Sequence, residues 1–246
     1  RLARVPEPGG AARALARLRA DPAVRWAEPN RWHAAAAVPA DPLFTLQWGL
    51  RNTGQSVGGV QGVAGADIRA AEAWDITTGD PRVRVAVLDG GVDLTAPDLV
   101  PNLGVVNPGE SGDGREANGI DDDGNGLVDD WRGWDVVDGD ADPSGDEPDR
   151  HGSTVAGVIA ARGGDGHGIA GVSWSARLIP VRGLDAEGLG TTADLAAGIT
   201  YAASMGARIL NASFGGPQST AIREAIRAAP HVLVVAAAGN GGPSPP

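Results

Sequence analysis

The stretch VRVAVLDGGVD, residues 83–93, is the part of this chain that most directly indicates its fold. Its apolar, β-branched residues form a run of the length of a buried strand, and the run ends in Asp89 followed by two glycines. We therefore expect Asp89 at the carboxyl end of a strand, the edge of an open parallel sheet at which ligands bind. An aspartate in an ordinary turn is the simpler interpretation of this residue alone.

A histidine opens a second informative stretch, HGSTVAGVIAA at residues 151–161. Gly152 permits close approach of the backbone, and the Ala, Val and Ile residues that follow suit a buried helix. This order predicts His151 at the mouth of a helix, where an imidazole can serve as a general base and acid. A surface or helix-capping histidine is the alternative that this stretch alone leaves open.

The rest of the chain alternates strand patterns with helix patterns. Apolar runs predict strands, and hydroxyl residues before the helical patterns predict helix caps. The expected strands are 177–181, 207–213 and 231–238, and the expected helices are 192–205 and 219–228. This alternation predicts an α/β fold with a doubly wound, mostly parallel sheet and helices on both faces.

Four segments, taken together, resemble the motifs of the subtilisin-like serine proteases, the subtilases. The resemblance runs from about Asp41 to Asn240. It rests on VAVLDGGVD with PDL (85–93 and 97–99), HGSTVAG (151–157), NASFG (211–215) and AAGN (237–240). An aspartate, then a histidine, then a serine is the chain order of the subtilisin triad.

The resemblance implies a role for each matching position. Asp89 would orient His151, and His151 would be the base and acid of an endopeptidase that cleaves proteins or peptides. Asn240 would supply the oxyanion-hole amide, which binds the charge that develops in the transition state. Ser213, Phe214 and Gly215 would bind the substrate backbone by strand addition, and Ala237, Ala238 and Gly239 would form the other wall of the specificity pocket.

The catalytic serine is missing from these motifs. The segment Gly-Thr-Ser-x-Ala, which carries the nucleophile in this family, does not occur in the sequence. Ser244 lies between prolines and cannot open the buried helix on which that nucleophile is mounted. We therefore expect a chain that stops before its serine and is inactive by itself. A calcium-binding pseudoprotease, or another peptide-binding protein without the nucleophile, is the alternative.

Acidic residues are concentrated in one part of the chain. The formal net charge is −11, and residues 110–149 contain 15 acidic and 2 basic residues. Within them, Asp121, Asp123 and Asn125 have the spacing of the first ligands of an EF-hand loop, and Gly126 falls at its sharp turn. Leu127 would add its carbonyl, and Asp129 or Asp130 would close the shell, so the sequence predicts a calcium site. A solvated acidic loop is the other interpretation.

The resemblance implies a second calcium site at Asp41 and Asp98, which match ligand positions of the family. From the sequence alone, both aspartates are ordinary turn or cap residues. Bound calcium would stabilise the fold by mass action. It would take the place of disulfides, since the chain has no cysteine.

Residues 1–37 have a different character from the rest. They predict a short helix at 10–20 and a strand at 23–29, too little to bury a core alone. The segment resembles the end of a subtilase propeptide, which implies an intramolecular inhibitor followed by a catalytic domain at 38–246. A simple N-terminal extension is the alternative.

The composition of the chain bears on which partners it binds and on where it is located. Acidity confined to one segment argues against a nucleic acid partner, and no stretch has the about 20 apolar residues of a membrane span. The resemblance implies a secreted, monomeric enzyme.

Overall fold

The computed structural model describes residues 10–28, 38–145 and 150–240. The chain divides into two units, Arg1–Ala35 and Ala36–Pro246. In the first unit, helix α1 (Gly10–Ala20) lies where the sequence predicts it.

The strand predicted at 23–29 is wrong for residues 23–28, and residue 29 lies outside the described residues. Asp21 Oδ1 accepts a hydrogen bond from the Ala23 N–H at 2.9 Å, and Arg19 Nε donates to the Ala27 carbonyl at 3.0 Å. These bonds turn the chain back onto the end of α1. A strand needs a ladder partner, and the described part of this unit supplies none.

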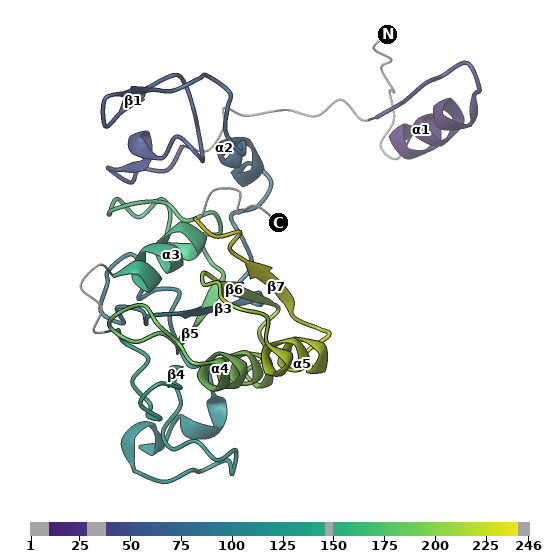
Figure 1. Ribbon diagram of the computed structural model, residues 1–246. Coiled ribbons are helices and arrows are strands. Elements are labelled where there is room, and N and C mark those ends of the chain that lie inside the picture. Colours follow the sequence, from purple (N-terminus) through teal and green to yellow (C-terminus); the bar gives the residue numbers. More distant parts are fainter. Residues whose placement is uncertain (1–9, 29–37, 146–149, 241–246) are drawn as a thin grey trace. The chain divides into compact units, whose positions relative to one another are not determined.

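The second unit is built on a five-stranded sheet with the order β4-β5-β3-β6-β7 (Figure 1). The strands are β3 (Arg84–Asp89), β4 (Trp134–Asp135), β5 (Arg177–Arg182), β6 (Ile209–Ala212) and β7 (Leu233–Ala236). All four neighbouring pairs are parallel. The predicted parallel sheet is confirmed. The sequence did not predict β4, because two residues are too few to show a strand pattern.

Helices cover both faces of this sheet, as predicted. Helix α3 (His151–Ala160) lies on one face, and α4 (Thr192–Ser204) and α5 (Thr220–Ala228) lie on the other (Figure 1). Thr191 and Asp194 form a capping box at the start of α4, and Ser219 caps α5 by accepting from the Ile222 N–H at 3.2 Å.

Alternation along the strands divides the core into two layers. Val85, Val87 and Leu178 pack with α3. Leu88, Ile179 and Leu210 face the other way and pack with α4. Residues on β3 therefore switch faces at each step, and Asp89 falls on the face that α3 covers.

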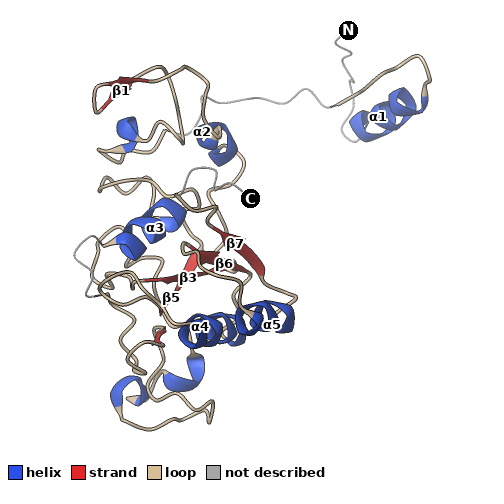
Figure 2. Cartoon of the chain, viewed as in Figure 1, coloured by secondary structure: helices blue, strands red, loops and turns tan. Residues whose placement is uncertain are grey.

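The remaining elements are short, and loops make up much of the chain (Figure 2). They are η1 (Phe44–Leu46), β1 (Ser56–Val57), β2 (Val60–Gln61), α2 (Ala70–Trp74), η2 (Pro108–Glu110) and η3 (Arg115–Ala117). Phe44, Leu50 and Trp74 form a separate apolar cluster near the start of the second unit. Among the described residues, no helix is long and apolar enough to cross a membrane.

Leu210→Ala is expected to lower the free energy of unfolding by about 2–5 kcal/mol, because this side chain is fully buried beneath α4. The matched change Leu233→Ala, on the neighbouring strand, removes a side chain that is 63% exposed and should cost about 0.5 kcal/mol or less. Urea unfolding followed by circular dichroism measures both. Equal losses would contradict the described packing of the sheet.

Candidate functional site

The two residues predicted to be catalytic form a pair. His151 Nδ1 lies 2.7 Å from Asp89 Oδ1. Asp89 is 1% exposed, whereas the His151 side chain is 48% exposed. An ionised carboxylate only accepts hydrogen bonds, so Nδ1 carries the proton and Nε2 of the neutral ring is left as the basic atom. The pair therefore has the arrangement of an oriented general base.

Close packing of glycines holds this pair together. A Cβ on Gly152 would lie 2.1 Å from the Gly91 carbonyl oxygen, and Gly91 itself has φ of +104°. Helix α3 therefore begins directly against the turn that follows β3. No larger residue at 152 permits this approach, because the atom it would meet is backbone and cannot rotate away.

The predicted substrate-binding residues lie at the same edge of the sheet. Ser213, Phe214 and Gly215 follow β6, and Ala237, Ala238 and Gly239 follow β7. The Ala237 N–H donates to the Ala212 carbonyl at 3.0 Å, which extends the β6–β7 pairing past the assigned strands. Because β6 pairs directly with β3, these segments follow the same carboxyl edge as Asp89. Asn240 is the last residue described and is exposed.

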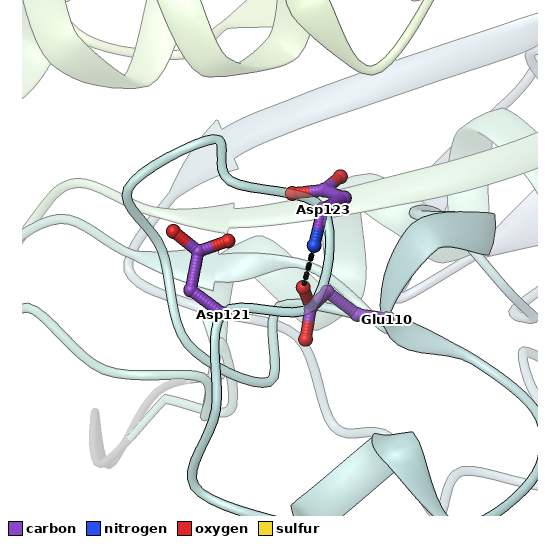
Figure 3. Close-up of side chains that lie close together, drawn as sticks. All are labelled: Glu110, Asp121 and Asp123. Carbon is purple, nitrogen blue, oxygen red and sulfur yellow. Dashed lines mark hydrogen bonds between the residues drawn. The ribbon is translucent and has the colours of Figure 1, made fainter.

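The acidic segment folds around a carboxylate that the sequence did not single out. Glu110 is fully buried, and its Oε1 accepts from the backbone N–H groups of Asp122 at 2.6 Å and Asp123 at 3.1 Å. Carboxylate oxygens of Glu110, Asp121 and Asp123 all lie within 4.8 Å of one another (Figure 3). Glu110 stands 11 positions before Asp121 in the sequence and outside the EF-hand spacing, so its role is decided by the fold.

Asp121 organises the turn that follows it. Its carboxylate accepts from the N–H groups of Gly124 at 2.7 Å, Asn125 at 3.1 Å and Gly126 at 2.8 Å. These backbone donors, that of Gly126 first, lower the pKa of Asp121. The carboxylate is thereby kept ionised, which is the form that binds a hard cation.

Asp130 lies beneath the same loop and is buried. Asn107 Nδ2 donates to Asp130 Oδ1 at 2.6 Å and to Asp123 Oδ2 at 2.9 Å, so it links the two carboxylates. Asn125 Nδ2 lies 3.4 Å from Asp130 Oδ2. Burial raises the pKa of Asp130. Leu127 packs partly against the core, and its N–H donates to Asn125 Oδ1 at 2.7 Å.

The other predicted calcium residues, Asp41 and Asp98, hold one loop between them. Asp41 Oδ2 accepts from the Gly164 N–H at 2.7 Å, and Asp98 Oδ2 accepts from the Ile169 N–H at 2.9 Å. Asp41 is 4% exposed and its Oδ1 is buried without a hydrogen-bond partner. Burying a carboxylate oxygen without a hydrogen-bond partner costs about 1–3 kcal/mol of stability. A bound cation would supply the missing partner, so this atom has the chemistry of a cation ligand.

A buried ion pair that the sequence analysis did not predict involves the Cα partner of Asp89 on β5. Arg182, at the end of β5, contacts the carboxylates of Asp135 and Asp138 and is 6% exposed. Burial opposes the charged form of Arg182, but the hydrogen bonds that Arg182 donates to both carboxylates outweigh it and raise its pKa. The RLIPVR pattern predicts the strand but does not show what its last arginine contacts.

The second unit is thus an α/β fold with a parallel sheet and a hydrogen-bonded Asp–His pair at the carboxyl edge of that sheet. Residues 80–246 match the Subtilase family, and the chain belongs to that family. It is 35% identical over 231 residues to a thermophilic serine proteinase of Bacillus sp. (strain AK1), covering 92% of this chain and 47% of that protein. The chain thus spans about half the length of this relative.

Solved structures agree with the fold. A crystal structure of the Aeromonas sobria serine protease in complex with a chaperone matches with a TM-score of 0.59 and 28% identity, over 77% of this chain and 29% of that one. Proteases of Pseudoalteromonas arctica match with a TM-score of 0.60 and 28% identity, over 83% of this chain and 60% of that one. The subtilisin-like α/β fold and a serine-peptidase family are therefore established for this chain.

Gly152→Ala is expected to destabilise the second unit by about 1–3 kcal/mol, because the new methyl group meets the Gly91 carbonyl. Gly49→Ala is the control, since a Cβ at Gly49 has nothing within 4 Å. Chemical denaturation measures the loss, and proton NMR of the His151 Nδ1–H reports whether the pair is displaced. A neutral Gly152→Ala would contradict the described contact.

Proposed function

We propose that this chain provides the aspartate, the histidine and the oxyanion amide of a subtilisin-type serine endopeptidase. The observation that carries the proposal is the 2.7 Å contact between the buried Asp89 and the half-exposed His151 at the carboxyl edge of the sheet. Family membership supports a serine-type peptidase. The nucleophilic serine is expected in a segment that is not part of this sequence.

In this proposal, His151 Nε2 takes the proton of the serine hydroxyl as that oxygen attacks the peptide carbonyl. Asp89 stabilises the imidazolium that forms and keeps the ring in the productive tautomer. The imidazolium then protonates the leaving amine. The Asn240 side-chain amide donates to the oxyanion, which strengthens binding of the transition state over that of the substrate.

Substrates are expected to be proteins or peptides that bind in extended form. The segments 213–215 and 237–239 leave adjacent parallel strands, so an extended peptide can lie along them and form backbone hydrogen bonds. Specificity would then rest on the pocket that these segments wall rather than on the recognition of polar side chains of the substrate.

We assign residues 1–37 to the end of an inhibitory propeptide and 38–246 to the catalytic domain of a secreted, monomeric enzyme. The support is the resemblance of the N-terminal segment, with its helix α1 (Gly10–Ala20), to such propeptides. The Aeromonas sobria protease was solved together with a chaperone, a precedent for a subtilase-fold protease with a bound folding partner. Cleavage is expected between about His33 and Asp41, where residues up to 37 lie outside the described residues.

Activity is tested on the natural full-length product, in which any serine-bearing segment is present. His151→Ala is expected to lower kcat by about 10⁶-fold, and Asp89→Asn by about 10⁴-fold. Asn240→Ala is expected to lower it by about 10²–10³-fold, the loss that removal of this donor causes in subtilisin. Hydrolysis of casein and of peptide anilides measures these changes.

Leu233→Ala serves as the control in the same assay, since it alters the sheet without touching either segment of the site. A full-length product with no activity, but with calcium-dependent peptide binding, would contradict the endopeptidase and favour the pseudoprotease.

We further propose that the chain binds calcium at two places. The first is the acidic segment, with Asp121, Asp123, Asn125, Leu127 and Asp130 joined by Glu110. Three carboxylates whose oxygens lie within 4.8 Å repel one another unless a cation neutralises them. The second is the loop held by Asp41 and Asp98, where Asp41 Oδ1 is buried without a partner. Asp41 and Asp98 would hold a calcium ion there, and its charge would neutralise theirs and stabilise the fold.

Calcium is expected to raise the melting temperature of this chain by about 5–10 °C when its free concentration is about 100 times the dissociation constant. Chelation should reverse the rise. Glu110→Gln and Asp121→Asn should each remove part of it, and Asp41→Asn should remove the part that comes from the second site. Asp113→Asn is the control, because it removes one charge from the acidic segment outside the cluster. Differential scanning calorimetry measures the shifts. No change on adding calcium would contradict both sites.

A further inference from the structure

Three charged residues lie in one row across the carboxyl edge of the sheet. Asp135 on β4 pairs in register with Arg182 on β5, and Arg182 pairs in register with Asp89 on β3. In-register neighbours of a parallel sheet point to the same face. Asp89 is on the face covered by α3, so the Arg182 and Asp135 side chains are on that face as well.

Arg182 is buried and incompletely satisfied. One of its terminal nitrogens, Nη1, contacts Asp135, which is buried, and Asp138, which is exposed. Its Nε is buried and has no hydrogen-bond partner. Burying a guanidinium costs desolvation free energy, so each of its N–H donors is expected to have an acceptor.

The Asp89 carboxylate also lacks one hydrogen-bond partner, and the partner that it lacks is a donor. Its Oδ1 accepts from the Gly90 N–H at 2.9 Å and from His151 Nδ1 at 2.7 Å. Its Oδ2 is buried without a partner. A lone donor and a lone acceptor therefore belong to residues that are direct neighbours on adjacent strands.

We propose that Arg182 is a positioning residue for the Asp89–His151 pair, through one buried water that accepts from Arg182 Nε–H and donates to Asp89 Oδ2. Arg182 and Asp89 are Cα partners on adjacent strands, and one water can accept one hydrogen bond and donate another at about 2.8 Å each. The bridge satisfies both orphaned atoms at once. Asp135 and Asp138 hold the guanidinium from its other side.

This role explains why a charge is buried beside the catalytic carboxylate. With Oδ2 tied to Arg182, the Asp89 carboxylate cannot rotate about its Cβ–Cγ bond, and Oδ1 stays directed at His151. Among the described residues, Arg150 and Asp93 are charged neighbours of the pair along the chain, and they lie 3.9 Å apart. The inference rests on the proposed function, because positioning matters only if Asp89 and His151 act together.

The test is Arg182→Lys in this chain, followed by NMR titration of His151. Lysine keeps the positive charge and can reach the same carboxylates, but it lacks the planar guanidinium with its Nε–H. We expect the fold and melting temperature to be nearly retained. The midpoint of the His151 titration should fall by about 0.5 pH units, and the Nδ1–H proton signal should broaden through faster exchange with water.

Arg177→Lys is the matched control, the same change at the other end of β5, where Arg177 Nη1 donates to the carbonyls of Pro101 and Leu103. It should leave the midpoint and the proton signal unchanged. A folded Arg182→Lys variant with an unchanged midpoint and signal would overturn the proposal.

Asp89→Asn separates this inference from the proposed function. If Asp89→Asn lowers the His151 midpoint strongly and Arg182→Lys does not, the catalytic pair stands and the role of Arg182 fails. If neither variant moves the midpoint, the pair itself fails. A high-resolution crystal structure of the chain gives a second measure: density for a water bonded to both Arg182 Nε and Asp89 Oδ2 supports the bridge, and separate partners for these atoms overturn it.

Discussion

Parallel pairing of β3 with β5 on one side and β6 on the other is the constraint on which the rest of the structure depends. It gives the strands a common carboxyl edge, so that segments distant in sequence end side by side. Asp89 ends β3 at that edge, and the segments after β6 and β7 leave from it. Helix α3 can then meet the edge from one face while α4 and α5 fill the other with apolar side chains.

Two features of the structure restrict the proposed catalytic pair, Asp89 and His151. Backbone packing at Gly152 and Gly91 brings the start of α3 against the end of β3 with no space for a side chain between them. Polar side chains then flank Asp89: His151 contacts one oxygen of its carboxylate, and Arg182 is its Cα partner on the neighbouring strand. A general base is effective only when its partner holds it in one orientation, and both devices restrict that orientation.

The acidic segment shows how carboxylates can organise a loop that contains little regular structure. Glu110 and Asp121 each accept several backbone N–H groups, so their charges replace the hydrogen bonds that a helix or strand would supply. The same oxygens that order the loop also lie close to one another, and a hard cation would neutralise the repulsion between them. In this segment the order of the loop and its affinity for metal would arise from the same side chains.

The sequence by itself determined the α/β class, the strand that ends at Asp89, the strand that precedes Ser213, the helix that begins at His151, and the family, because these depend on local periodicity and contiguous motifs. It could not determine that residues 23–28 form no strand, since strand formation depends on a partner elsewhere in the chain. Only the tertiary structure brought Glu110 to Asp121 and Arg182 to Asp89, because hydrogen-bond register across strands and loops is set by packing rather than by neighbours in sequence.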